Sequence, residues 1–175
     1  ILRVENLRKA GSFQPLSFTV GEGEIVGLIG LVGSGKEEVC KCLAGLERAD
    51  AGSITLDGQK LPSGSPSSAV RAGLGNIPID RRSEGLALMM NVAENVNLLV
   101  LNRLKAGGFL SPAREIKNAH HWVAECQIKT PSIATLCSNL SGGNQQKTVI
   151  SKWLSSRVRL LILYHPTRGV DVGAK

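Results

Sequence analysis

Aromatic side chains are scarce in this chain and make up only 3% of its 175 residues. Proteins that bind single-stranded nucleic acid combine clustered Lys and Arg with aromatic side chains on which bases stack. The chain is basic, with a formal net charge of +7, but its Lys and Arg residues are scattered along the sequence. We therefore expect no nucleic-acid partner, and a basic surface that suits a small anionic ligand.

Long apolar runs are absent too, so no segment is long enough to span a bilayer as a helix. Any association with a membrane is then expected to go through a partner. The chain starts at Ile1 without a signal-peptide pattern, and we expect it to be a piece of a longer protein. Its composition, 42% hydrophobic and 20% charged residues, fits one globular core with a small additional lobe.

The four cysteines form no Cys-x-x-Cys pair, which makes a zinc site or a redox motif a poor interpretation. Cys40 and Cys42 fall on an expected helix, where residues two positions apart do not face each other. We expect free thiols in a reducing compartment.

Apolar periodicity predicts that strands and helices alternate along the chain. The near-continuous apolar run at residues 25–29 is typical of a strand buried on both faces. Residues 86–140 have a helical pattern, and Ser111-Pro112 is a typical helix start. We expect strands at residues 16–20, 25–29, 53–58, 74–77 and 160–163, and helices at residues 36–45, 69–72, 91–104, 112–126 and 143–155.

A glycine-rich loop between an expected strand and an expected helix predicts a phosphate-binding site. Gly30, Gly33, Gly35 and Lys36 fit the pattern G-x-x-x-x-G-K, in which backbone N–H groups and the helix N-terminus surround a phosphate. The alternative is a Gly-rich turn that ends in Lys by chance. The predicted nucleotide-binding residues are Gly30, Leu31, Val32, Gly33, Ser34, Gly35, Lys36, Glu37 and Glu38.

A second Gly-rich segment, residues 140–147, reads Leu-Ser-Gly-Gly-Asn-Gln-Gln-Lys and opens the last expected helix. The hydroxyl of Ser141 and the N–H groups of Gly142 and Gly143 form a second candidate anion site. A plain Ser N-cap explains Ser141 alone, but not the whole segment. The predicted binding residues here are Leu140, Ser141, Gly142, Gly143, Asn144 and Gln145.

These motifs together resemble an ABC ATPase, and specifically the second ATPase half of the sugar-import class. Residues 76–86 are similar to the Q-loop region of that class, although Ile79 stands where a Glu is usual. Residues 160–171 are similar to the Walker B strand followed by the D-loop, with Asp171 as the D-loop residue. The resemblance implies ATP and Mg²⁺ as cofactors, and it implies that the segment at Ser141 contacts ATP held by an opposite ATPase domain. It also makes Phe13 a candidate for stacking on the base of the nucleotide, although Phe13 is at least as good a candidate for the core.

Three positions depart from the family pattern at the metal and water site. Glu37 replaces the Ser or Thr whose hydroxyl ligates Mg²⁺, while Tyr164 and His165 replace the Walker B Asp-Glu pair. A phenol is protonated at neutral pH and does not ligate Mg²⁺ as a carboxylate does. We therefore expect no intact catalytic residue and no metal ligand in this domain, although its signature segment is complete.

The fold that the resemblance implies is α/β: a P-loop NTPase (RecA-like) core with an N-terminal antiparallel β lobe and an inserted helical lobe. We expect residues 1–86 and 141–175 to form the core with its β lobe, and residues 87–140 to form the helical lobe.

The expected function is ATP binding in a sugar importer at the cytoplasmic face of the membrane, with ATP turnover at the level of the complex. Expected partners are a sibling ATPase domain, a membrane-spanning permease that contacts the Q-loop and helical lobe, and, indirectly, a periplasmic sugar-binding protein. The alternative is a non-hydrolysing ABC-like pseudoenzyme that acts as a regulatory or docking module.

Overall fold

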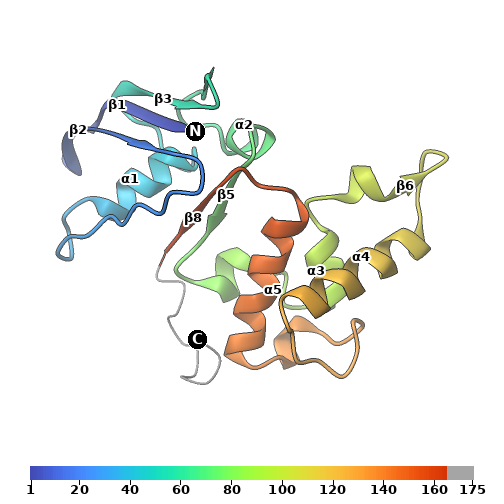
Figure 1. The fold of residues 1–175 in the computed structure, drawn as a ribbon. Coiled ribbons are helices and arrows are strands. Elements are labelled where there is room, and N and C mark those ends of the chain that lie inside the picture. Colours follow the sequence, from blue (N-terminus) through green and yellow to red (C-terminus); the bar gives the residue numbers. More distant parts are fainter. Residues whose placement is uncertain (165–175) are drawn as a thin grey trace. The chain divides into compact units, whose positions relative to one another are not determined.

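The computed structural model describes residues 1–164, which form two compact units (Figure 1). The first unit contains Ile1–Asn76 and Arg159–Ile162, and the second contains Ile77–Val158 with residues 163–164. The predicted α/β class is confirmed, because the structure combines an antiparallel β lobe with helices as P-loop NTPases do. The predicted division into an ATPase core (residues 1–86 and 141–175) and a helical lobe (residues 87–140) has other bounds than these compact units. It rests on the family resemblance and stays a prediction.

The first unit is built on a four-stranded antiparallel sheet in the order β2-β1-β3-β4. Its central strand, β1 (Leu2–Lys9), points Leu2, Val4 and Leu7 into the core, each at most 3% exposed. The pairing register of β1 shifts between Val4 and Leu7, where Asn6 takes a positive φ of 47°, and this bulge returns Leu7 to the buried face. The other strands are β2 (Phe13–Val20), β3 (Ala51–Leu56) and β4 (Gln59–Lys60).

Two helices and a second sheet complete this unit. Helix α1 (Lys36–Leu43) follows the glycine-rich loop, and α2 (Pro66–Arg71) leads into β5 (Leu74–Ile77). Strand β5 pairs with β8 (Leu160–Leu163) in a two-stranded sheet. The strands expected at residues 74–77 and 160–163 are confirmed, although Leu163 is 48% exposed and β8 is less buried than its four aliphatic residues predict.

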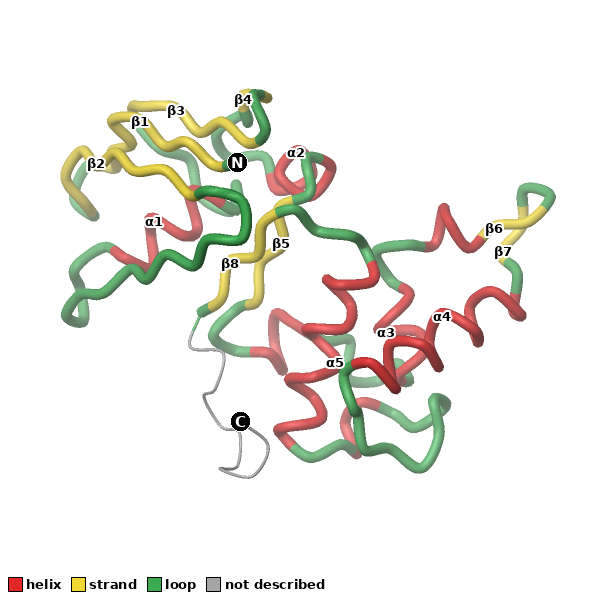
Figure 2. The backbone as a smooth tube through the Cα atoms, in the orientation of Figure 1, coloured by secondary structure: helices red, strands yellow, loops and turns green. Residues whose placement is uncertain are grey.

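The prediction of a strand at residues 25–29 is wrong, because these residues form no strand in the structure. Figure 2 shows an unbroken loop between β2 and α1, in which Ile25 and Ile29 are almost fully exposed. An apolar run forms a strand only where neighbouring strands complete its backbone hydrogen bonds. None of the sheets formed by residues 1–164 includes this segment, and periodicity alone carries no information about such neighbours.

The second unit is a helical cluster formed by α3 (Val92–Asn97), α4 (Pro112–Glu125) and α5 (Gly142–Ser155). Val92, Val96, Ala119 and Val149 are completely buried where these helices meet. Short elements connect them: one turn of π-helix, η1 (Arg81–Gly85), the 3₁₀ turns η2 (Leu101–Leu104) and η3 (Cys137–Asn139), and the hairpin strands β6 (Lys105–Ala106) and β7 (Phe109–Leu110).

The single helix predicted at residues 91–104 is broken in the structure. Helix α3 ends at Asn97, and η2 follows after a turn. The buried amide of Asn97 donates to the carbonyl oxygen of Glu115 at 3.1 Å and accepts from Asn118 at 2.8 Å. These bonds tie the end of α3 to α4, and the apolar spacing that predicted one long helix does not reveal them.

Candidate functional site

The glycine-rich loop turns sharply into α1, as the P-loop pattern predicts. Gly33 and Gly35 have φ values of 81° and 83°, which L side chains rarely adopt. Ser34 N–H donates to the carbonyl oxygen of Leu31 at 3.1 Å, and α1 begins at Lys36. The first turn of α1 carries Glu37 and Glu38, both half-buried. The loop and helix are therefore in place, but the strand that precedes the loop in the P-loop pattern is absent from residues 25–29.

Lys36 bends back over the loop, where its ammonium group donates to the carbonyl oxygen of Leu31 at 3.3 Å. Gly30 lies close to the other end of the loop, since a Cβ at this position would lie 3.0 Å from the Cβ of Ser34. The loop thus folds back on itself, with the Lys36 ammonium group at the Leu31 carbonyl. A glycine-rich loop at a helix N-terminus, with one flexible cation beside it, is suited to bind an anionic phosphate group.

A cavity of about 430 Å³ joins Phe13 to this loop. Its wall is the turn between β1 and β2, and the loop contributes Ser34. At Gly35 any added Cβ would lie 2.8 Å from the Cβ of Phe13 and would clash with the carbonyl of Ser12, so only Gly fits. The structure therefore brings Phe13 close to the phosphate loop, and its role in nucleotide binding stays a prediction. The lining residues are Arg8, Lys9, Ala10, Gly11, Ser12, Phe13, Gln14 and Ser34.

The signature segment forms the start of α5, with Ser141 exposed at the N-cap position. The hydroxyl of Ser141 makes no capping hydrogen bond to the backbone of the helix. It accepts instead from the side-chain amide of Asn144 at 3.0 Å, while the side-chain oxygen of Asn144 accepts from Lys129 N–H at 2.8 Å. A simple Ser N-cap therefore does not account for this residue, and the hydroxyl is held at the surface.

Buried neighbours fix the position of this helix start. The amide of Gln145 is 3% exposed and donates to the carbonyl oxygen of Cys137 at 3.0 Å. Leu140 and Gly143 are also buried, whereas Gly142 is half-buried. Among the six predicted signature residues, Ser141 therefore forms an exposed tip, and Leu140, Gly143 and Gln145 form a buried base.

Tyr164 directly follows β8, and its backbone N–H donates to the carbonyl oxygen of Ile77 at 3.1 Å. The residue is buried, at 8% exposure. His165 and Asp171, the other two residues predicted in this region, lie outside the described residues. Within residues 1–164 no group of three His, Cys, Asp or Glu side chains is placed to hold a metal ion.

The segment predicted as a Q-loop forms η1 behind Asp80, the N-cap residue. The Asp80 carboxylate accepts from Arg82 N–H at 2.9 Å and from Ser83 N–H at 3.4 Å. Hydrogen bonds from the Ser83 side chain and from these N–H groups hold the pKa of the Asp80 carboxyl below its usual range. Ile79, where the family has Glu, is half-buried.

Sequence reasoning missed Lys152, which links η1 to α5. This lysine is 9% exposed, its ammonium group donates to the carbonyl oxygen of Gly85, and burial lowers its pKa. A signal was present, because Lys152 is seven residues after Gln145 and three after Val149, which places all three on one face of the helix. That face is the buried one.

The described part of the chain has no helix that combines the length and the apolar content needed to cross a membrane.

Curated relatives match the chain over its full length. It is 46% identical over 175 residues to the "Ribose import ATP-binding protein RbsA" of Cereibacter sphaeroides, and the aligned region covers 100% of this chain and 35% of that protein. It is also 46% identical over 175 residues to the "Putative ribose/galactose/methyl galactoside import ATP-binding protein 1" of Burkholderia ambifaria, again covering 100% of this chain and 34% of the relative. The chain thus spans about a third of the length of these relatives.

Solved structures confirm the fold. An ATP-binding cassette in a dimeric post-hydrolysis state with ADP and phosphate superposes with a TM-score of 0.80 at 21% identity, covering 99% of this chain and 78% of that one. A nucleotide-free cassette from an ABC transporter gives the same TM-score and identity, with 99% and 72% coverage. The family model for ABC transporters matches residues 13–168. The chain therefore belongs to the ABC transporter family.

Proposed function

We propose that this chain is a nucleotide-binding domain of an ABC sugar importer, which binds ATP and completes the ATP site of a sibling domain. The observation that carries the proposal is the exposed Ser141 hydroxyl at the start of α5, held by Asn144 and not used to cap the helix. A hydroxyl and free N–H groups at a helix N-terminus suit a phosphate presented from outside the chain. The names of the relatives from Cereibacter sphaeroides and Burkholderia ambifaria support sugar import.

The domain's own nucleotide binds at residues 30–38, with Phe13 against the base. The cavity that joins Phe13 to Ser34 supports this placement, and so does the position of Lys36 at the edge of the loop. Phosphates lie on the loop N–H groups, and Lys36 moves from the Leu31 carbonyl to the β- and γ-phosphates.

Hydrolysis at this domain's own site is impaired. Glu37 and Tyr164 occupy the two positions that would hold Mg²⁺, and one carboxylate together with a phenol does not supply the oxygen donors that Mg²⁺ prefers. His165 occupies the position of the carboxylate that would polarise the attacking water. ATP turnover therefore belongs to the sibling domain's site, which the signature of this chain completes.

The remaining partners follow from the importer assignment. The segment with η1 and the helical lobe at residues 87–140 contact the membrane-spanning permease, and a periplasmic sugar-binding protein delivers the sugar. The domain works at the cytoplasmic face of the membrane. Residues 1–86 and 141–175 act as the ATPase core in this arrangement.

Two substitutions in the assembled pair of ATPase domains test the asymmetry. We expect Ser141→Arg to lower ATP turnover roughly a hundredfold, since the arginine side chain displaces the γ-phosphate from its donors. Lys36→Ala should change turnover by less than about twofold, because the site it weakens does not hydrolyse ATP. The controls are Ser67→Arg and Lys60→Ala, at exposed positions of α2 and β4. Equal losses from Ser141→Arg and Lys36→Ala would overturn the proposal.

The alternative, a pseudoenzyme that only docks to a partner, predicts a different outcome. A scaffold does not need a hydroxyl held at the tip of α5. We expect ATP to drive association of this domain with its sibling, measured by analytical ultracentrifugation, and Ser141→Arg to abolish that association. Association that is independent of nucleotide would support the docking module.

A further inference from the structure

The cavity beside the phosphate loop has one wall made almost entirely of a short turn. Residues 10–12 connect β1 to β2, with Ser12 N–H donating to the carbonyl oxygen of Lys9 at 3.1 Å and Gly11 at a φ of 74°. This turn carries Phe13 at its end. The direction of the Phe13 ring therefore depends on how firmly the turn is held.

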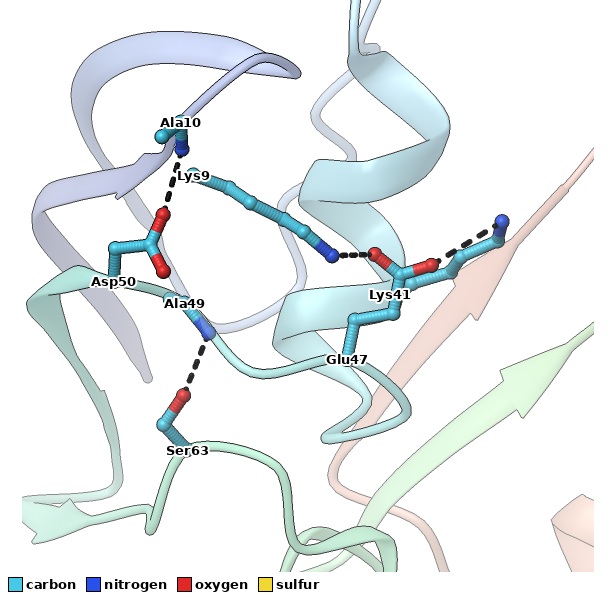
Figure 3. A network of polar contacts seen from close by, with 7 residues as sticks. All are labelled: Lys9, Ala10, Lys41, Glu47, Ala49, Asp50 and Ser63. Atoms are coloured by element: carbon cyan, nitrogen blue, oxygen red, sulfur yellow. Dashed lines mark hydrogen bonds and ion pairs between the residues drawn. The ribbon is translucent and has the colours of Figure 1, made fainter.

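Two carboxylates from a loop after α1 hold that turn (Figure 3). Glu47 forms an ion pair with Lys9, and its other oxygen lies 3.5 Å from the ammonium group of Lys41. Asp50 accepts from Ala10 N–H at 2.7 Å, and its own N–H donates to the carbonyl oxygen of Arg8 at 2.9 Å. The end of the turn that follows β1 is thus attached to one short segment through three successive residues.

The same segment is anchored to the helix that starts at the phosphate loop. The N–H groups of Leu46 and Glu47 donate to the carbonyl oxygen of Lys41 in α1, at 2.8 and 3.3 Å. On the other side, Ala49 N–H donates to the hydroxyl of Ser63 at 2.8 Å (Figure 3). The loop therefore connects the helix of the phosphate site to the wall that carries the candidate base-stacking residue.

We propose that Glu47 and Asp50 are positioning residues that hold the β1–β2 turn against the phosphate loop and so set the affinity for the nucleoside end of the nucleotide. This rests on the proposed function, in that the cavity holds ATP. Neither carboxylate lines the cavity, so both act through Lys9, Ala10 and Phe13.

The charge of Glu47 also sets the chemistry of the cavity. Lys9 lines the cavity, and the carboxylate neutralises an ammonium group that would otherwise be free to swing into it. The hydrogen bond from Lys9 lowers the pKa of Glu47, with additional contributions from the charges of Lys9 and Lys41, so the carboxylate is ionised at neutral pH. Both partners of the pair are only partly exposed, at 27% and 29% of their side chains, which distinguishes it from a freely solvated surface pair.

The test separates the two ends of the ligand by measuring the affinities of the purified protein for ATP and for inorganic tripolyphosphate by calorimetry. We expect Glu47→Ala and Asp50→Ala to weaken ATP binding about threefold to tenfold, because a displaced wall loses its contacts with the base. Tripolyphosphate binding should stay within about twofold, because the phosphate loop is intact. Asp50→Asn should bind ATP like the unchanged protein, since an amide oxygen still accepts from Ala10 N–H.

A matched control is Glu5→Gln, which breaks an ion pair with Arg3 (2.8 Å) on the same sheet but away from the cavity. We expect it to leave both affinities unchanged. Equal loss of ATP and tripolyphosphate affinity in the alanine variants, or no loss of either, overturns the inference while the proposed function stands. Failure of the unchanged protein to bind ATP overturns the proposed function instead. If an alanine variant does not fold, Asp50→Asn and Lys9→Met are compared instead. Lys9→Met must then weaken the binding of ATP more than the binding of tripolyphosphate.

Discussion

The thiol of Cys137 lies in the core of the second unit, where the side-chain amide of Asn95 donates to its sulfur at 3.2 Å. Burial, with a smaller contribution from the charge of Glu94, raises the pKa of Cys137 to about 11, and the charge of Lys152 opposes the shift. The prediction that the four cysteines form no disulfide is confirmed. This thiol is a small apolar core residue and not a nucleophile.

The raised pKa of Cys137 makes stability depend on alkaline pH. In the unfolded chain the thiol ionises near its ordinary pKa, while in the folded protein it stays protonated up to about pH 11. The stability that this pKa difference adds to the folded protein is therefore complete below the ordinary thiol pKa, and it is lost as pH rises through the pKa of the folded protein. With allowance for solvent screening we expect on the order of 1 kcal/mol.

The difference in free energy of unfolding between the unchanged protein and Cys137→Ala, measured by urea denaturation from pH 8 to 11, should shrink as pH rises. Val96→Ala, which truncates a buried side chain that carries no titratable group, should show no such trend. A difference that is constant across this pH range would contradict the assignment.

Among the elements, α3 and α4 begin in different ways although each has a polar N-cap residue. The side chain of Asn91 accepts from Glu94 N–H at 2.9 Å, and the Glu94 carboxylate accepts from Asn91 N–H at 2.7 Å, which forms a reciprocal capping box. Ser111, the N-cap of α4, makes no side-chain capping bond. The sequence predicted the Ser111-Pro112 start correctly, but it did not predict which cap would be used.

We expect Asn91→Ala to lower the free energy of unfolding by about 1 kcal/mol, because N–H groups at the start of α3 lose their acceptor. Ser111→Ala should change it by less than about 0.5 kcal/mol, since its hydroxyl caps nothing. Chemical denaturation of both variants under the same conditions measures the comparison. Similar losses at the two positions would mean that the caps are equivalent in solution.

The structure shows which elements were predictable and why others were not. Helix α5, strands β2 and β3, and the turn from the glycine-rich loop into α1 follow from local signals: glycines at positive φ, apolar spacing and cap residues. Residues 25–29 have equally strong local signals and form no strand, because strand formation also needs hydrogen-bonding neighbours from distant parts of the chain. Strand β1 was missed because its bulge at Asn6 breaks the alternation that marks a strand.

At the scale of the whole molecule, the two candidate binding segments lie in different compact units. The phosphate loop and its cavity belong to the first unit, and the signature belongs to the second. The motifs themselves were predictable, because each is a contiguous run of residues. The contacts that support them join residues far apart in sequence, such as Glu47 with Lys9 and Lys152 with Gly85, and a single sequence gives no distance between such pairs.

The contact between Lys152 and Gly85 connects the two segments proposed to contact partners, because α5 starts at the signature and η1 follows β5 in the Q-loop region. Lysine is rarely buried this deeply unless its ammonium group has a partner. Here the partners are the Gly85 carbonyl and the ring of Trp153, whose centroid lies 5.9 Å from the ammonium nitrogen. We therefore expect this side chain to help hold η1 against α5.

We expect Lys152→Met to leave the fold intact, because methionine fills most of the same volume, and to loosen η1 selectively. Loss of a hydrogen bond from a charged donor should raise amide hydrogen exchange at residues 81–85 by about tenfold. Lys147→Met is the control, since Lys147 on the same helix donates to the Gln127 carbonyl at 3.2 Å and does not contact η1. Exchange at residues 81–85 that is the same in both variants would show that Lys152 does not hold η1.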